Sequence, residues 1–154
     1  MTTIMPEKTI INDIQWFMER EGEVIATSEP FEIDRDRIQS FCTAIDNREW
    51  VHWDEDRCNE QFGGVISPLF MLPALFPTLF FNSFEYGKIN ALFYGTNKFR
   101  LLAPVIAGAR VAATTRIAEV VKKENAITVH YDVTFNLVGQ EKPVAAGTFL
   151  VRYW

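Results

Sequence analysis

The sequence predicts an α+β fold in which an antiparallel sheet wraps around one long buried helix, and three observations support this. The seventeen residues from Val65 to Phe81 carry no charge, as expected of a helix enclosed by its own protein. Four segments after Ile89 alternate apolar and polar residues or are rich in branched and aromatic residues, as strands are. Their short connections favour antiparallel neighbours, because a parallel pair needs a long crossover. We expect residues 1–154 to form a single domain.

The N-terminal part predicts a short helix and then a strand. Apolar residues recur at the spacing of one helical face within residues 12–21, and Gly22 follows them. This pattern predicts a helical extension over about residues 10–22. Residues 24–33 are rich enough in branched residues to predict a strand, which Pro30 interrupts.

Two further helices follow. Asp34 is a suitable N-cap for a helix over residues 35–45, because its carboxylate can accept hydrogen bonds from the first free N–H groups. An irregular polar segment then leads to the uncharged helix. Ser67 is expected to cap that helix and Pro68 to occupy its first position. Pro73 is expected to remove one internal hydrogen bond and bend the helix.

The C-terminal half is predicted to be β-sheet. The four expected strands are Ala91 to Leu102, Arg110 to Lys122, Ala126 to Leu137 and Val144 to Tyr153. The element order is therefore strand, helix, buried helix and four strands with short connections. A sheet wrapped around one apolar helix satisfies this order, and that arrangement is the hot-dog fold.

Composition argues against several classes of partner. The net charge is −5, and acidic residues outnumber basic ones 20 to 15 without any basic run, so we expect no nucleic-acid partner. The uncharged segment 65–81 is short for a bilayer, is interrupted by prolines and lacks basic flanks, so we expect no membrane span. Cys42 and Cys58 belong to no Cys/His cluster, which argues against a zinc site and a disulfide framework. With no signal peptide evident at the N-terminus, we expect a protein of the reducing cytoplasm.

Three motifs occur in order along the chain. The first, FCTAIDNREWVHWD, covers residues 41–54; the second, FGGVISP, covers 62–68; the third, YGTNKFRLLAPV, covers 94–105 and is followed by Gly108. Together they resemble the MaoC-like (R)-specific enoyl-thioester hydratases and dehydratases, and more closely the branch of nodulation protein N. The resemblance covers about residues 23–154, and the order and separation of the motifs make it specific.

This resemblance implies a hot-dog domain, usually a homodimer, that acts on acyl-CoA or acyl-carrier-protein thioesters without a cofactor or a metal. In the family, an Asp and a His activate one water and add it to a 2-enoyl chain, or remove it from an (R)-3-hydroxyacyl chain. A backbone N–H at a helix start polarises the thioester carbonyl, where developing enolate charge is stabilised.

Carried over residue by residue, the catalytic His is His52, and the catalytic Asp position is occupied by Asn47. Asp46 stands one place earlier, where the family usually has Gly or another residue. Asn can hold a water but cannot accept its proton. We therefore expect His52, Asp46 and Asn47 to form the catalytic set, with either Asp46 turned into the site or Glu49 reaching it. Alternatively, this stretch is a polar loop in which Asn47 ends the preceding helix in the left-handed conformation.

The substrate-binding residues are expected around the helix start and on one strand. Gly64, Ser67 and Leu69 fall on the second motif, where Leu69 replaces the Gly whose N–H faces the carbonyl. Lys98 and Arg100 are predicted contacts for a CoA or phosphopantetheine phosphate, or else a solvated strand face.

Further along the helix, Pro77 occupies the place where some hydratases carry a Ser. With Asn47 and Leu69, this departure supports an alternative function. In that alternative the protein is a diverged hot-dog protein without hydratase activity: a thioester-binding or pairing subunit, or a biosynthetic isomerase or cyclase.

Overall fold

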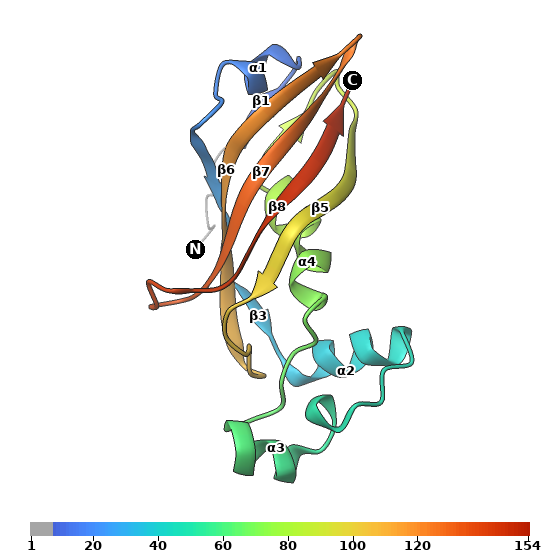
Figure 1. Cartoon of the computed structure of the whole chain (residues 1–154), viewed down its shortest axis with the longest axis vertical. Coiled ribbons are helices and arrows are strands. Elements are labelled where there is room, and N and C mark those ends of the chain that lie inside the picture. Colours follow the sequence, from blue (N-terminus) through green and yellow to red (C-terminus); the bar gives the residue numbers. More distant parts are fainter. Residues whose placement is uncertain (1–7) are drawn as a thin grey trace, which may run out of the picture.

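The computed structural model describes residues 8–154 and shows a long curved sheet that encloses one helix (Figure 1). In chain order the helices are α1 (Gln15–Met18), α2 (Arg35–Ala44), the 3-10 turn η1 (Trp50–His52), α3 (Glu55–Phe62) and α4 (Met71–Phe81). The strands are β1 (Thr9–Ile11), β2 (Val24–Thr27), β3 (Phe31–Ile33), β4 (Phe84–Tyr86), β5 (Ala91–Leu101), β6 (Ala109–Lys123), β7 (Ala126–Leu137) and β8 (Pro143–Tyr153). The larger sheet is antiparallel with the order β2-β6-β7-β8-β5, and β3 also pairs with β6.

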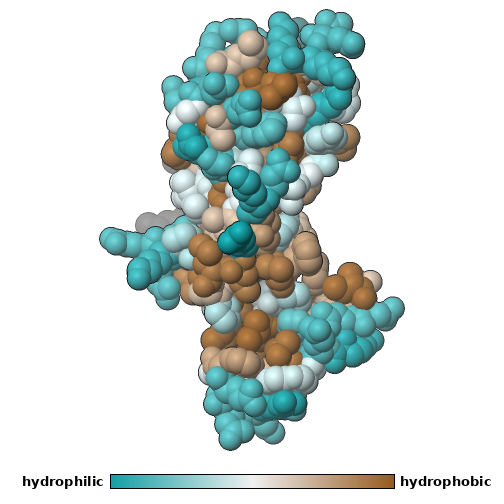
Figure 2. Space-filling view, in the orientation of Figure 1, coloured by the Kyte–Doolittle hydropathy of each residue, from teal (hydrophilic) through white to brown (hydrophobic). Residues whose placement is uncertain are grey.

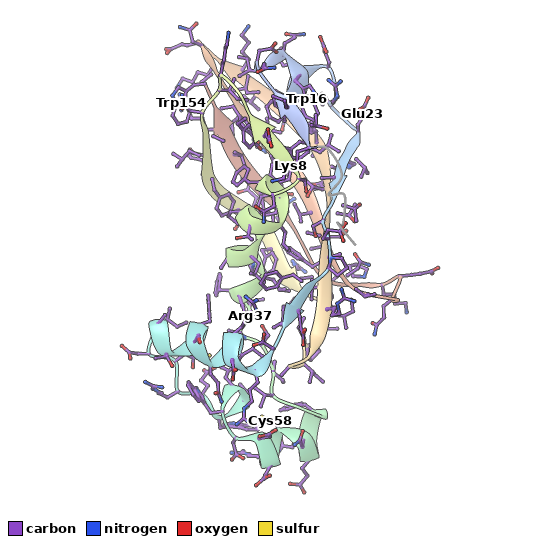
Figure 3. The ribbon with its side chains drawn as sticks, turned by 180° about the vertical axis from the view of Figure 1, so that it is seen from behind. Lys8, Trp16, Glu23, Arg37, Cys58 and Trp154 are labelled. Atoms are coloured by element: carbon purple, nitrogen blue, oxygen red, sulfur yellow. The ribbon has the colours of Figure 1, made fainter. Side chains whose placement is uncertain are left out.

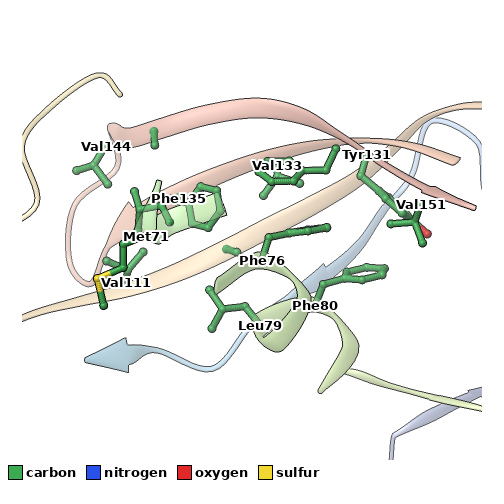
Figure 4. Packing of buried hydrophobic residues seen from close by; sticks show 14 of the residues in the cluster. Met71, Phe76, Leu79, Phe80, Val111, Tyr131, Val133, Phe135, Val144 and Val151 are labelled. Carbon is green, nitrogen blue, oxygen red and sulfur yellow. The ribbon is translucent and has the colours of Figure 1, made fainter. Parts of the chain in front are cut away.

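The core lies between α4 and the concave face of this sheet (Figure 4). The centre of the Phe76 ring lies 4.4 Å from that of Phe149 on β8, and the Phe80 ring lies 4.8 Å from Tyr131 on β7. Because side chains alternate between the two faces of a strand, Tyr131, Val133 and Phe135 are buried together on this face. The predicted α+β hot-dog fold is confirmed.

All four C-terminal strands lie where the sequence predicts them, with ends that differ by at most one residue. The predicted strand over 24–33 is found as two pieces, β2 and β3, separated by the segment that contains Pro30. Asp34 caps α2 as expected, since its side chain accepts a hydrogen bond of 2.8 Å from the N–H of Arg37. The N-terminal helix is shorter than predicted, a single turn over Gln15–Met18.

The start of α4 differs from the prediction. The helix begins at Met71 with Phe70 as N-cap, and Ser67 Oγ bonds the carbonyl of Pro68 instead of a helix N–H, so Ser67 is not its cap. Pro73 lies in the first turn, where its missing N–H removes no helix bond. The proline within the helix is Pro77, whose missing N–H leaves the carbonyl four residues earlier without a helix partner.

Two features were not predicted. Helix α3 occupies the segment interpreted as irregular, with Asp54 as N-cap and Gly63 in the left-handed conformation at its end. A short parallel pair, β1 with β4, lies at the end of the molecule that also carries α1. In the region that the structure describes, we find no helix of the length and apolarity needed to cross a membrane.

Candidate functional site

His52 lies at the end of the 3-10 turn η1 and is buried, with its side chain 6% exposed. Its Nδ1 atom lies 2.6 Å from the carbonyl oxygen of Ile66. A carbonyl can only accept, so Nδ1 is the donor of this bond, and in the neutral ring the lone pair lies on Nε2. The N–H of Ile66 in turn donates to the carbonyl of Val51 at 2.9 Å. Two hydrogen bonds therefore hold the His52 turn against the segment that leads into α4.

Glu49 is the acidic side chain beside the free nitrogen of His52. Its Oε2 lies 3.6 Å from His52 Nε2, and its side chain is 73% exposed. The two residues are three apart in one turn, which the hydrogen bond from His52 N to the Glu49 carbonyl closes at 3.0 Å. The N–H of Glu49 donates to Oδ1 of Asn47 at 2.9 Å. Asn47 thus lies beside the site, with its amide oxygen occupied by the backbone of Glu49.

Asp46 does not reach this site. Its side chain is 94% exposed, and its nearest charged partner is Arg48 at 3.9 Å. The backbone of Asp46 has a φ of +55°, and the N–H of Asn47 bonds the carbonyl of Cys42 at 2.9 Å, which together end α2 in a left-handed turn. Asp46, and not Asn47, is therefore the left-handed residue. Its position has a backbone conformation that glycine adopts most readily.

Tryptophans on both sides of His52 fix the turn. Trp53 Nε1 donates to the carbonyl of Asn47 at 2.9 Å. Two residues of α3 contact the Trp50 ring. The Phe62 ring is stacked on it with ring centres 5.8 Å apart, and the guanidinium of Arg57 lies 3.7 Å from the centre of the Trp50 ring. Helix α3 therefore supports the turn that carries Glu49 and His52.

The start of α4 lies close by in the chain. Ser67 N donates to the Val105 carbonyl at 2.8 Å, which ties the segment to the loop between β5 and β6, and Met71 N bonds the Pro68 carbonyl at 3.1 Å. Within residues 8–154, the N–H groups of Leu69 and Phe70 donate to no backbone or side-chain acceptor. These are the free amides of a helix N-terminus, where a negative charge is stabilised. Leu69 is 38% exposed.

Gly64 has a structural role. A Cβ atom at this position would overlap with the Cγ2 atom of Ile106, and the φ of Gly64 is +156°. The close approach allows Ile66 and Ile106 to form a β-bridge. Gly64 thus places the strand-like segment that holds His52 and precedes α4.

Lys98 and Arg100 lie away from His52. They line a shallow hollow together with Asp132, Thr134 and Thr148, whose side chains alternate with the buried core residues of β7 and β8. The hollow is therefore on the convex face of the sheet, opposite α4. The predicted phosphate contact of Lys98 and Arg100 stays a prediction.

An apolar hollow of about 350 Å³ lies between β3, α2 and the start of α4. Figure 3 labels Arg37 at this junction, and its guanidinium lies 4.4 Å from the ring centre of Phe31. The remaining lining residues are Ser40, Phe41, Met71, Ala74 and Leu75. In the chain from Lys8 onward, no three His, Cys, Asp or Glu side chains converge as metal ligands would.

The chain matches known proteins over most of its length. The family described as "FAS1-like, dehydratase domain region" matches residues 20–145. The chain is 31% identical over 135 residues to 3-hydroxyacyl-thioester dehydratase Z of Mycobacterium tuberculosis, covering 86% of this chain and 89% of that protein. It is 24% identical over 134 residues to nodulation protein N of Rhizobium meliloti, covering 84% and 83%.

Its fold also matches that of a MaoC-like dehydratase from Rhodospirillum rubrum, with a TM-score of 0.71, 17% identity and coverage of 86% and 90%. The match of the family to most of the chain and the identity to dehydratase Z confirm the resemblance that the three motifs indicate. The chain belongs to the MaoC-like, FAS1-dehydratase-region family of hot-dog proteins, which includes 3-hydroxyacyl-thioester dehydratases and has nodulation protein N among its homologues.

Proposed function

We propose that this protein is a hydro-lyase that interconverts 2-enoyl and (R)-3-hydroxyacyl thioesters of CoA or an acyl carrier protein. One observation carries the proposal. The Nε2 atom of a buried, oriented histidine, which the bond from Nδ1 leaves free of that contact, lies on a turn that is hydrogen-bonded to the segment opening into the free amides of α4. A general base and an oxyanion-stabilising donor are the two groups that this reaction needs.

In the hydration direction, Nε2 of His52 takes a proton from water while the water oxygen forms a bond to C3 of the enoyl chain. The electron pair of the C2–C3 double bond moves towards the thioester, and negative charge develops on its carbonyl oxygen. The free N–H groups of Leu69 and Phe70 are the donors for that oxygen. The protonated His52 then delivers the proton to C2, which completes addition of one water. Dehydration follows the same steps in reverse.

The sheet edge supports a homodimer. Strand β5 is the last strand in the sheet order. Within residues 8–154 it pairs only with β8. Its outward face exposes Leu92 and Tyr94, and apolar surface gathers where β5 ends and α4 begins (Figure 2). A long edge strand with exposed apolar side chains is a surface that soluble proteins normally cover. A second copy of the chain is the partner we propose.

A specific observation also favours a second candidate function. Asn47, which stands where the family has its catalytic Asp, carries an amide. Asp46 is exposed and forms part of the turn that ends α2. A subunit that binds an acyl thioester without converting it needs the amides of α4 but no carboxylate. In that case the purified protein would bind an acyl-CoA, and no substrate would be consumed.

The two candidates are separated by adding short, medium and long 2-enoyl-CoA thioesters to the purified protein and following the absorbance of the conjugated thioester. We expect the absorbance to fall with the wild type and to persist with His52→Ala. Binding of the thioester without any fall in absorbance would support the second candidate. A fall of equal rate in His52→Ala would contradict the proposed role of His52.

A further inference from the structure

We propose that Glu49 is a catalytic residue that supplies the carboxylate missing from position 47. This inference rests on the proposed hydro-lyase function and concerns the same site. It assigns to Glu49 the task of holding the reacting water together with His52, and of stabilising the imidazolium that forms when His52 takes the proton.

The backbone of the 3-10 turn holds Glu49 beside His52. The 3-10 turn places residues three apart on the same side, so the side chains of Glu49 and His52 project together. The carbonyl of Glu49 accepts the N–H of His52, and its own N–H bonds Asn47 Oδ1. Both polar groups of the Glu49 backbone are therefore used, and the carboxylate is the part left free to act.

The separation fits a bridging water. Glu49 Oε2 and His52 Nε2 are 3.6 Å apart, which is too long for a good direct hydrogen bond. One water beside both atoms can donate one O–H to the carboxylate and the other to Nε2. Nε2 is available because Nδ1 already donates to Ile66. The water oxygen then keeps its lone pairs for C3 of the enoyl chain.

The neighbouring charged groups do not compete for this role. Asp46 faces solvent near Arg48, and the guanidinium of Arg48 lies over the Trp53 ring with a 5.3 Å separation from its centre. Among residues 8–154, His52 is the one basic side chain within 4 Å of the Glu49 carboxylate. Because this carboxylate is exposed, water and substrate can reach it.

The proton balance closes with these two side chains. The water proton moves to Nε2 as the C3–O bond forms, and the resulting imidazolium lies next to the negative Glu49. The same proton then passes from Nε2 to C2, so that His52 returns to its neutral form and Glu49 remains ionised throughout. An amide at position 49 would keep a hydrogen bond to water but would lose the stabilising charge.

The substitution Glu49→Gln tests this, with Glu60→Gln on α3 as a matched exposed control that has no ion pair in the described region. We expect kcat on a 2-enoyl-CoA to fall about 10²-fold or more in Glu49→Gln, with little change in KM, and to stay at the wild-type value in Glu60→Gln. Melting temperatures of the variants identify any loss of fold, and Glu49→Asp shows whether a shorter carboxylate can act.

The decisive variant places an Asp at position 47, where the family has its catalytic acid. We expect Asn47→Asp combined with Glu49→Gln to regain most of the lost kcat, because a carboxylate again lies beside His52. If Glu49→Gln keeps wild-type kcat while His52→Ala is inactive, Glu49 has no catalytic role and the proposed function stands. If the wild type converts no thioester of any length, both proposals are overturned. A gain of activity by Asn47→Asp in an otherwise inactive protein would also show that Glu49 does not replace Asp.

Discussion

The Nδ1 atom of His52 donates a hydrogen bond of 2.6 Å to the carbonyl oxygen of Ile66, fourteen residues further along the chain. This bond determines the tautomer of the imidazole and turns Nε2 towards Glu49. It also joins the turn that carries His52 to the segment that precedes the free amides of α4. Backbone groups of Ile66 therefore hold the His52 ring and its turn in place.

Replacing His52 by Asn or by Gln separates the structural role of the ring from its chemical role. The amide N–H₂ of Asn can take the place of Nδ1 and still donate to Ile66, whereas the longer Gln cannot do so without shifting. We expect His52→Asn to melt near the wild-type temperature. His52→Gln should lose about 1–3 kcal/mol, because a buried carbonyl is left unpaired.

Both variants lack a base at the Nε2 position, so each should lose about 10²- to 10⁴-fold in kcat. Thermal unfolding followed by circular dichroism gives the stabilities, and the absorbance assay gives kcat. Equal melting temperatures for the two variants would show that the bond to Ile66 contributes little.

Leu69 tests the oxyanion donor. Leu69→Pro deletes the free N–H at the start of α4, whereas Leu69→Ala keeps it and removes the side chain. We expect kcat/KM to fall about 10²- to 10³-fold in Leu69→Pro. It should change little in Leu69→Ala. A fall of similar size in Leu69→Ala would assign the effect to the side chain, not to the N–H.

Gly64 should tolerate no side chain. Gly64→Ala is expected to destabilise the protein by about 1–3 kcal/mol, because the new methyl group overlaps with Ile106. Removing the Ile106 side chain down to Cβ in Gly64→Ala/Ile106→Ala relieves that overlap. The double variant should therefore cost less than the sum of the two single variants. Urea unfolding of all four proteins measures this coupling, and strict additivity would contradict the contact.

Asp46 occupies a backbone conformation that glycine adopts more readily. We expect Asp46→Gly to stabilise the protein or leave its stability unchanged, because φ is +55° and the side chain is 94% exposed, with only a long contact to Arg48. Asp46→Val should destabilise it by about 1 kcal/mol or more, since a branched side chain is strained there. Thermal unfolding of both variants checks the prediction, and a marked loss of stability in Asp46→Gly would contradict it.

The tyrosines of the core predict a loss of stability in alkali. Burial raises the pKa of Tyr86 to about 12, and that of Tyr131 and of Tyr153 well above 10. Tyr131 and Tyr153 share a hydrogen bond of 2.7 Å, whereas the hydroxyl of Tyr86 has no partner in the described region. The folded state therefore holds these protons more tightly than the unfolded state does.

The contribution of Tyr86 is complete below about pH 10, where both states are protonated, and it declines as the pH rises towards 12. Urea unfolding between pH 8 and about 12 should show this decline. In Tyr86→Phe the slope should be shallower. Because that variant also removes an unpaired buried hydroxyl, it should be no less stable than the wild type at neutral pH. An identical slope in the two proteins would contradict the assignment to Tyr86.

The sheet was predictable because its signal is local and periodic. Val133 and Phe135 share one face of β7, and the alternation that places them there can be read directly from the sequence. Helix α3 was missed because all its residues except Cys58 and Phe62 are polar, which leaves too few apolar residues for a clear stripe. Its caps, Asp54 and Gly63, were the available signals. Three-residue strands such as β1 and β4 carry no period at all.

The arrangement around His52 was predictable in part. The motif predicts His52 as the catalytic histidine, which stays a prediction, and it places Asn47 at the position of the acid. The sequence did not decide between Asp46 and Glu49, because that choice depends on backbone conformation. A left-handed residue at 46 turns one carboxylate outward, and a 3-10 turn over 50–52 places the other beside the ring. Nor could the sequence show that β5 carries Lys98 on the convex face, since bulges change its alternation.

The most direct test of the central claim is to add a trans-2-enoyl-CoA to the wild type and to His52→Asn in heavy water and to analyse the products by mass spectrometry and chiral separation. The account predicts that the wild type forms the (R)-3-hydroxyacyl-CoA with one deuterium at C2, and that the variant forms it at least about 10²-fold more slowly. Unchanged enoyl-CoA after prolonged incubation with the wild type, or equal product formation by both proteins, would contradict it.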